Sequence, residues 1–296
     1  MNGLQHSSGY VDLHCHGGGG FYFSDVNPEN INSAIEFHKS NGTSQLLESL
    51  VSETIPDLKS QIKRLIPFCS SGLIAGIHLE GPYLAKARCG AHNPKLLKSP
   101  ELDEIKDLLE FSNGFIKMIT IAPELNNSLG IIEYLSANKV IAAVGHSDGD
   151  YDDALQAVDA GASLVTHFSN GMSKLKDGNR TFATALLYKS EIPLEIIFDR
   201  QHVSDEDLQT IFEIAPNRIV LVTDAMAAAG KPDGLYQIGT LEVVVKDGTA
   251  RLSSNGALAG STLSMDLVVE NAKTYGLPNS FIDNSTRTLP LSLLNL

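Results

Sequence analysis

Short apolar segments rich in β-branched residues alternate along the chain with longer segments of helical periodicity. Eight apolar segments are typical of strands, and helical patterns of about 10 to 15 residues occupy most of the intervals between them. The expected strands are Tyr10–His16, Thr43–Val51, Leu73–Glu80, Phe115–Ile121, Val140–His146, Leu164–His167, Leu194–Phe198 and Ile219–Asp224. Strands and helices that alternate in this way predict a parallel sheet.

Helix start and stop signals agree with these strands. Gly42 follows one predicted helix, Ser99-Pro100 precedes another, and Ser204 is placed to cap a third. The expected helices with clear boundaries are Pro28–Asn41, Glu101–Phe111, Asp205–Ala215 and about 264–275. A right-handed series of eight such βα units closes into a (β/α)8 TIM-type barrel, which is the fold class that we expect.

Two segments bear on the domain organisation. Gly17–Gly20 follows the first strand but lacks the GxGxxG register of a doubly wound nucleotide-binding sheet, so we interpret it as a flexible βα loop. Residues 234–254 have the alternation of a β-hairpin, with Asp247-Gly248 at the turn. No internal repeat or linker stands out. We therefore expect residues 1–296 to form a single barrel domain with a hairpin insertion at about 234–254.

Charge and cysteine content limit the partners and the compartment. The chain has 22 Lys and Arg against 35 Asp and Glu, a formal charge of -13, which disfavours nucleic acid and anionic membranes. The three cysteines show no Cys-x-x-Cys spacing, and the first residues lack a secretory pattern. We expect a cytoplasmic protein that binds a small molecule.

Histidines and carboxylates recur where the predicted strands end. Catalytic groups of a barrel come from the carboxyl ends of several strands, so these residues are expected at one rim. They are His14 and His16, Glu80, His146, His167 and Asp224. Each residue alone is also typical of a buried structural histidine or a turn carboxylate. Their repetition over several strands favours a shared site.

Imidazole and carboxylate ligands suit a divalent ion such as zinc or iron. His14 and His16 are two residues apart on a strand, so both reach the same face. Glu80, His146 and His167 would leave one coordination position for water, and Asp224 could take a proton from that water.

The remaining histidines and the cations divide into two groups. His92 and His202 follow the third and seventh strands at the rim, and His78 lies on the same strand face as Glu80. We expect His6 and His38 to be solvated. The cations near the rim are few, so an anionic substrate points to Arg180 or Arg200, the latter beside Asp199, although both are also typical of solvated surface charges.

Five motifs in order resemble a known family. They are VDLHCHG, GIHLEGPYLAKARCGAHNP, AVGHSDGDYDDALQAVDAGASLVTHFSNGM, LVTDAMAAAG and GALAGSTLSMD. Together they resemble the N-acetylglucosamine-6-phosphate deacetylases of the amidohydrolase superfamily, from about Gly9 to Tyr275.

The resemblance implies roles for individual residues. It implies that Glu80, His146 and His167 bind a metal, that His14 and His16 bind a second metal in some members, and that Asp224 is the general base and acid. It places His92 near the acetyl carbonyl. The substrate-contacting residues that it implies are Ala91, His92, Asn170, Gly171, His202, Leu258, Ala259 and Gly260. It also implies one or two divalent ions per chain and a homodimer.

Three departures from the family pattern concern the phosphate and the surrounding fold. The family arginine six residues after the methionine falls on Gly178, and Arg180 lies two residues further on. The family motif Asp-Gly-x-His reads Asp199-Arg200-Gln201-His202, which suggests that Arg200 helps to replace the shifted arginine. We also expect the small β-sandwich that flanks the family barrel to be largely missing, because Ser285–Leu296 resembles just the segment that closes the barrel.

The expected function is metal-dependent hydrolysis of the acetamide of N-acetyl-D-glucosamine 6-phosphate to D-glucosamine 6-phosphate and acetate. The altered arginine pattern leaves open a related amidohydrolase that acts on another N-acylated sugar or amide. A third alternative is a non-catalytic paralogue that binds a sugar phosphate.

Overall fold

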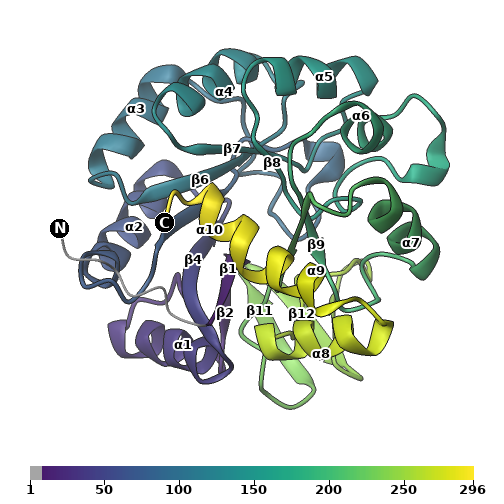
Figure 1. The fold of residues 1–296 in the computed structure, drawn as a ribbon. Helices are drawn as coiled ribbons and strands as arrows, with labels where there is room; N and C mark the ends of the chain where they lie inside the picture. Colours follow the sequence, from purple (N-terminus) through teal and green to yellow (C-terminus); the bar gives the residue numbers. More distant parts are fainter. Residues whose placement is uncertain (1–8) are drawn as a thin grey trace.

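The computed structural model describes residues 9–296 and has a ring of eight parallel strands at its centre (Figure 1). Neighbouring strands of the ring follow the order of the sequence, and the predicted (β/α)8 barrel is confirmed. The strands are β1 (Tyr10–Cys15), β4 (Thr43–Val51), β5 (Gly76–Glu80), β6 (Ile116–Ile121), β7 (Ile141–Val144), β8 (Leu164–Val165), β9 (Leu194–Ile197) and β10 (Ile219–Val222).

Helices surround this ring and bury their apolar faces against the strands (Figure 1). They are α1 (Pro28–Ser40), α2 (Ile55–Ser70), α3 (Leu102–Phe111), α4 (Ser128–Ala137), α5 (Tyr151–Asp159), α6 (Phe182–Lys189), α7 (Asp205–Ile214) and α8 (Met265–Tyr275), with short 3₁₀ turns at Lys86–Arg88 and Leu175–Asp177. Local signals fix several of their ends. Asn27 caps α1 by accepting the Glu29 N–H at 3.0 Å, and Gly276 ends α8 with a φ of 95°.

The first and last strands of the ring meet near their carboxyl ends. The Asp224 N–H donates to the His14 carbonyl at 2.8 Å, and the His16 N–H donates to the Ala225 carbonyl at 2.8 Å. The C-terminal segment packs against β1 and β10; it consists of α9 (Asn279–Asp283), a π-helical turn (Asn284–Thr288) and α10 (Leu289–Leu293) (Figure 1). The closure of the barrel therefore joins the backbone of three candidate site residues.

A second, smaller sheet follows β10 and corrects the expected hairpin. It has three antiparallel strands, β11 (Gly234–Ile238), β12 (Leu241–Lys246) and β13 (Thr249–Leu252). Asp247 and Gly248 form the predicted turn between β12 and β13, with φ values of 50° and 71°. The expected hairpin did not separate β11 from β12, and within β11 Ile238 is buried whereas Leu235 is exposed. That residues 1–296 form one domain stays a prediction.

The glycine-rich segment after β1 is ordered, contrary to the expectation of a flexible loop. Gly17–Gly18 (β2) pairs with Phe21–Tyr22 (β3) as a short hairpin. The Gly19 N–H donates to the Ala229 carbonyl at 2.9 Å and the Gly20 N–H to the Ala227 carbonyl at 2.8 Å. Backbone hydrogen bonds to the segment after β10 hold this loop in place.

The prediction that His38 is solvated was wrong. Its ring is fully buried under the first loop, with Nε2 3.0 Å from the Gly17 carbonyl oxygen and 3.1 Å from Cys15 Sγ. His38 lies seven residues after Ile31 and three after Ile35, both buried, so it occupies the inner face of α1. His6 lies outside the described residues. None of the helices within residues 9–296 has the length and apolar character required to cross a membrane.

Candidate active site and metal centre

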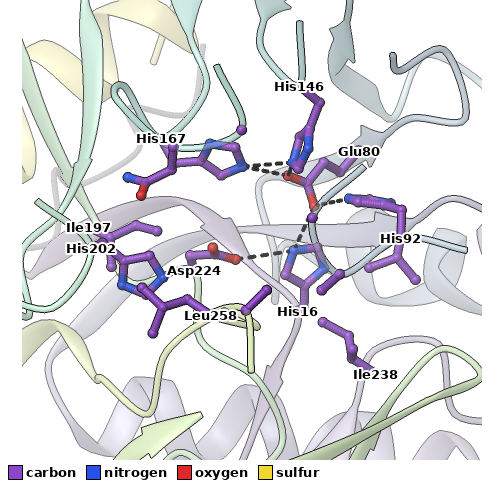
Figure 2. A pocket seen from close by; sticks show the side chains of 17 residues that line it. His16, Glu80, His92, His146, His167, Ile197, His202, Asp224, Ile238 and Leu258 are labelled. Carbon is purple, nitrogen blue, oxygen red and sulfur yellow. Dashed lines mark hydrogen bonds and ion pairs between the residues drawn. The ribbon is translucent and has the colours of Figure 1, made fainter. Parts of the chain in front are cut away.

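Glu80, at the carboxyl end of β5, has four histidine Nε2 atoms within 3.2 Å of its carboxylate (Figure 2). Its Oε1 lies 2.9 Å from His167 Nε2 and 3.1 Å from His146 Nε2. Its Oε2 lies 3.1 Å from His16 Nε2 and 3.2 Å from His92 Nε2. Side chains that follow β1, β7 and β8 and one from the loop after β5 therefore converge on one carboxylate.

A second group lies beside the first. Asp224 Oδ1 is 3.3 Å from His16 Nε2 and 3.6 Å from His14 Nε2, and the two histidine Nε2 atoms are 3.2 Å apart. His14 Nε2 also lies 3.6 Å from Glu80 Oε1. Since His14 and His16 point to the same face of β1, the pair connects the Glu80 cluster to Asp224.

Three site residues have a left-handed backbone conformation, which residues other than glycine rarely adopt. His146, His167 and Asp224 have φ values of 46°, 27° and 47°. Such conformations cost about 1–3 kcal/mol each and persist where surrounding structure holds them. These conformations explain why β7, β8 and β10 end before the predicted strands do. The extended backbone is broken near the residue whose side chain enters the pocket.

Hydrogen bonds to Nδ1 fix which ring nitrogen can bind a metal. His16 Nδ1–H donates to the Ser49 carbonyl at 3.1 Å, and His146 Nδ1–H donates to the Arg88 carbonyl at 2.7 Å. In a neutral ring the other nitrogen then carries a lone pair. His146 Nε2 lies 3.0 Å from His167 Nε2, so ring nitrogens face one another beside a carboxylate. This donor set fits a divalent cation, which imidazole and carboxylate ligands would share.

His92 differs from the other histidines around Glu80. Its Nδ1 accepts the Ser52 backbone N–H at 3.3 Å, which leaves the hydrogen of a neutral ring on Nε2. Burial lowers the pKa of His92, with the Glu80 carboxylate opposing that shift. His92 is therefore placed to donate a hydrogen bond from Nε2, whereas His146 offers a lone pair at Nε2.

The electrostatics of the cluster keep its carboxylates ionised. Burial raises the pKa of Asp224, but His14 and His16 outweigh burial and lower it to about 2. Glu80 is likewise held well below its ordinary pKa, because His14 and His92 outweigh burial. Burial lowers the pKa of His14, yet the Asp224 and Glu80 carboxylates raise it well above the ordinary value. Protons and a metal ion would therefore compete for the same nitrogens.

A cavity of about 260 Å³ opens above these groups. The site residues His16, Glu80, His146, His167 and Asp224 line it (Figure 2). The substrate-contacting residues expected from the sequence that also line it are Ala91, His92, Asn170, Gly171, His202, Leu258 and Gly260. Ala259 is buried beside them. Gly260 has a φ of 63°, and a Cβ there would meet the Asp224 carbonyl oxygen at 2.8 Å, so glycine lets this loop approach Asp224.

Asp199 does not line the cavity but positions His202. Its Oδ2 accepts from His202 Nδ1 at 2.7 Å, and its Oδ1 accepts the backbone N–H of Gln201 and of His202 at 2.8 and 3.0 Å. Burial raises the pKa of Asp199, but the hydrogen bonds and charge of His202 lower it overall. His202 Nε2 therefore remains available to a ligand.

Both candidate arginines point away from the cavity. Arg180 donates to Asp152 Oδ1 at 3.0 Å and stacks on the Tyr151 ring, with its guanidinium carbon 4.4 Å from the ring centroid. Arg200 has a φ of 60° and pairs with Asp205 at the surface. Within residues 9–296, no Lys or Arg lines the cavity. Phosphate binding by Arg180 or Arg200 stays a prediction and would need these loops to rearrange.

Sequence reasoning did not identify the apolar wall of the cavity. Val51 ends β4, Ile197 ends β9, and Ile238 comes from β11 of the small sheet (Figure 2). Val51 and Ile197 fall at strand ends, which is a usable signal. Ile238 carries none, because local alternation does not tell where an inserted sheet folds back.

The chain is similar to known deacetylases over most of its length. An N-acetylgalactosamine-6-phosphate deacetylase from Escherichia coli O157:H7 is 34% identical over 266 residues, 88% of this chain and 70% of that protein. An N-acetylglucosamine-6-phosphate deacetylase from Vibrio furnissii is 30% identical over 267 residues, 89% of this chain and 67% of that protein. No family model matches the chain.

A solved structure is similar in fold as well as in sequence. It is a mutant N-acetyl-D-glucosamine-6-phosphate deacetylase from Mycobacterium smegmatis in complex with N-acetyl-D-glucosamine 6-phosphate. It is 38% identical, has a TM-score of 0.93, and the match covers 97% of this chain and 77% of that chain.

Proposed function

The chain belongs to the N-acetylglucosamine-6-phosphate deacetylase family, and on that premise we propose that it hydrolyses the acetamide of N-acetyl-D-glucosamine 6-phosphate. The products are D-glucosamine 6-phosphate and acetate, and the reaction belongs to amino-sugar catabolism. The observation that carries the proposal is the convergence of four histidine Nε2 atoms on the Glu80 carboxylate, with Asp224 beside them.

The metal ligands of the proposal are Glu80, His146 and His167, with His14 and His16 available for a second ion. A divalent ion held there, zinc or iron, would polarise the acetamide carbonyl and lower the pKa of a bound water. The facing Nε2 atoms of His146 and His167, 3.0 Å apart beside the Glu80 carboxylate, support this assignment, and the hydrogen bond from His146 Nδ1 leaves a lone pair on His146 Nε2 when that ring is neutral.

Asp224 is the proposed general base and acid. Its low pKa keeps the carboxylate ionised at neutral pH, so it can take a proton from the attacking water. The water oxygen then bonds to the acetamide carbon. As the carbon–nitrogen bond breaks, Asp224 returns the proton to the amine nitrogen, and acetate and the amino sugar leave.

His92 is the proposed donor to the carbonyl oxygen. The Ser52 N–H holds its Nδ1 as an acceptor, so Nε2–H is the donor before substrate arrives. A preorganised donor of this kind stabilises the negative charge that develops on the oxygen in the transition state. His92 acts as a neutral imidazole in this role, which agrees with its lowered pKa.

The sugar phosphate would lie in the cavity beneath the small sheet. We assign its contacts to Ala91, Asn170, Gly171, His202 and the Leu258–Gly260 loop, which surround the cavity or lie against it. His202, held by Asp199, is the group of this chain best placed to meet a polar or anionic end of the ligand. A homodimer and a cytoplasmic location belong to the same proposal.

Acetate release tests this function. Purified protein loaded with zinc should release one acetate for each N-acetyl-D-glucosamine 6-phosphate consumed, and dialysis against a chelator should abolish the reaction until metal is restored. A metal-loaded protein that binds the sugar phosphate without releasing acetate would support the non-catalytic alternative.

The same assay should be run with N-acetyl-D-galactosamine 6-phosphate as a second substrate. The Escherichia coli relative is named as an N-acetylgalactosamine-6-phosphate deacetylase, and the two sugars differ in configuration at a single carbon. Comparing kcat/KM for the two sugar phosphates and for unphosphorylated N-acetyl-D-glucosamine separates the alternatives. We expect the N-acetylglucosamine phosphate to give the highest value.

A further inference from the structure

Glu195 lies on β9 inside the barrel, and the account of the reaction gives it no role. Its side chain is fully buried. Oε2 lies 3.1 Å from His14 Nδ1 and accepts the His167 backbone N–H at 3.2 Å. One oxygen atom of Glu195 therefore contacts both the His14 ring and the His167 backbone.

The partner of His14 Nδ1 differs in kind from the partners of His16 Nδ1 and His146 Nδ1. His16 and His146 donate from Nδ1 to backbone carbonyls, those of Ser49 and Arg88. His14 Nδ1 instead faces the Glu195 carboxylate. A carboxylate behind a histidine fixes the tautomer and makes the opposite nitrogen a stronger ligand than a carbonyl does.

The charge balance of the interior also points to a cation. Glu80, Asp224 and Glu195 are buried, and among residues 9–296 no Lys or Arg lies within ion-pair distance of any of them. Glu195 Oε1 has no hydrogen-bond partner in this part of the chain. Burying carboxylates is costly unless nearby positive charge compensates. Protonated histidines of the cluster or a divalent ion on the far side of His14 would supply it.

We propose that Glu195 is a positioning residue that holds His14 as a metal ligand. It keeps the His14 hydrogen on Nδ1 and directs Nε2 toward the space shared with His16, Glu80 and Asp224, where the Nε2 atoms of His14 and His16 are 3.2 Å apart. The same oxygen accepts the His167 N–H, so Glu195 also fixes the position of His14 relative to His167. This role rests on the proposed metal-dependent deacetylation.

The test is a zinc titration of metal-free protein. Glu195→Gln keeps the size of the side chain and removes its charge. We expect the ion held by His14 to bind about 10–100-fold more weakly, the range for loss of a residue that orients a metal ligand. Glu48→Gln is the matched control, because Glu48 is also a fully buried glutamate of a barrel strand and has no hydrogen-bond partner for either oxygen in the described chain. The zinc affinity of the Glu48→Gln protein should equal that of the unmutated protein.

A double-mutant cycle with His14→Ala shows whether Glu195 acts through His14. Once His14 is gone, Glu195→Gln should cost nothing further in zinc affinity. Unchanged zinc affinity in folded Glu195→Gln, an equal loss in Glu48→Gln, or a full additional loss in the His14→Ala background would each overturn the proposal.

If Glu195→Gln does not fold, a measurement on the unmutated protein still tests the proposal. In ¹⁵N NMR of the zinc-loaded protein, with the His14 signal assigned by its loss in His14→Ala, the His14 ring hydrogen should be on Nδ1. A hydrogen on Nε2 contradicts the proposal.

The proposed function is tested by different outcomes. Protein that neither binds zinc nor releases acetate refutes that function, whereas active protein whose zinc affinity is insensitive to Glu195→Gln refutes only the role of Glu195.

Discussion

Glu80 Oε1 lies 2.9 Å from His167 Nε2, although 87 residues separate them in the chain. The contact exists because β5 and β8 end at the same rim of the barrel and both residues follow buried strand segments. It joins the carboxylate to the histidine whose Nε2 also faces His146, and it thereby defines the centre of the proposed metal site.

Replacing the proposed base should separate binding from chemistry. Asp224→Asn keeps the shape of the side chain but cannot accept the proton from water, so kcat for acetate release should fall by about 10²–10⁴-fold. The zinc held by Glu80, His146 and His167 and the affinity for the sugar phosphate, measured by calorimetry, should stay near those of the unmutated protein. Retained turnover would remove Asp224 from the mechanism.

His92 should behave as a donor and not as a metal ligand. His92→Ala removes the Nε2–H group near Glu80, and we expect kcat to fall by about 10²–10³-fold, as for the loss of one oxyanion donor. Metal content should not change, whereas His146→Ala should lose metal. Elemental analysis of both variants decides between the two roles, and loss of metal from His92→Ala would contradict the tautomer assignment.

The two arginines should contribute little to affinity in the arrangement observed. Arg200 is paired with Asp205 and Arg180 with Asp152, both at the surface, and neither arginine lines the cavity. Arg180→Ala and Arg200→Ala should change KM for the sugar phosphate less than about 3-fold, while His202→Ala should raise it more. A large rise in KM for Arg200→Ala would show that its loop turns inward to hold the phosphate.

Stability should depend on pH through His38, away from the pocket. Burial lowers the pKa of His38 from 6.5 to about 4, with the Gly17 carbonyl opposing the shift. Above pH 6.5 the ring is neutral in both states. As pH falls from 6.5 toward 4 the unfolded chain binds a proton that the folded chain rejects, so the free energy of unfolding decreases.

Urea unfolding at pH 7 and pH 4.5 measures this effect. The decrease on acidification should be smaller in His38→Gln, whose amide can still donate to the Gly17 carbonyl but does not titrate. Equal decreases in the two proteins would show that His38 is not the group responsible.

The sequence was sufficient for the strand order and for predicting that the candidate ligands lie together at one rim of the barrel. The strand predicted over Thr43–Val51 has those bounds in the structure, because Gly42 on one side and the Thr54-capped helix α2 on the other leave few alternatives. Glu80, His146 and His167 were found because each follows an apolar strand. Their geometry was not accessible, since the positive φ at His146 and His167 depends on packing around the rim.

Two misses have different physical reasons. His38 shares the spacing of the apolar face of α1, and giving more weight to that spacing than to its polarity would have placed it inside. Glu195 lies in an otherwise apolar strand, but its partner is His14, 181 residues away, and no local pattern indicates such a pair. Contacts across the barrel interior require the closed fold.

The most direct test of the central claim is metal content and acetate release measured in the same preparation with N-acetyl-D-glucosamine 6-phosphate. Acetate release should rise in proportion to bound zinc or iron, fall to background in chelator-treated protein, and return when metal is restored. Full turnover by metal-free protein, or no acetate from fully metal-loaded protein, would contradict the account.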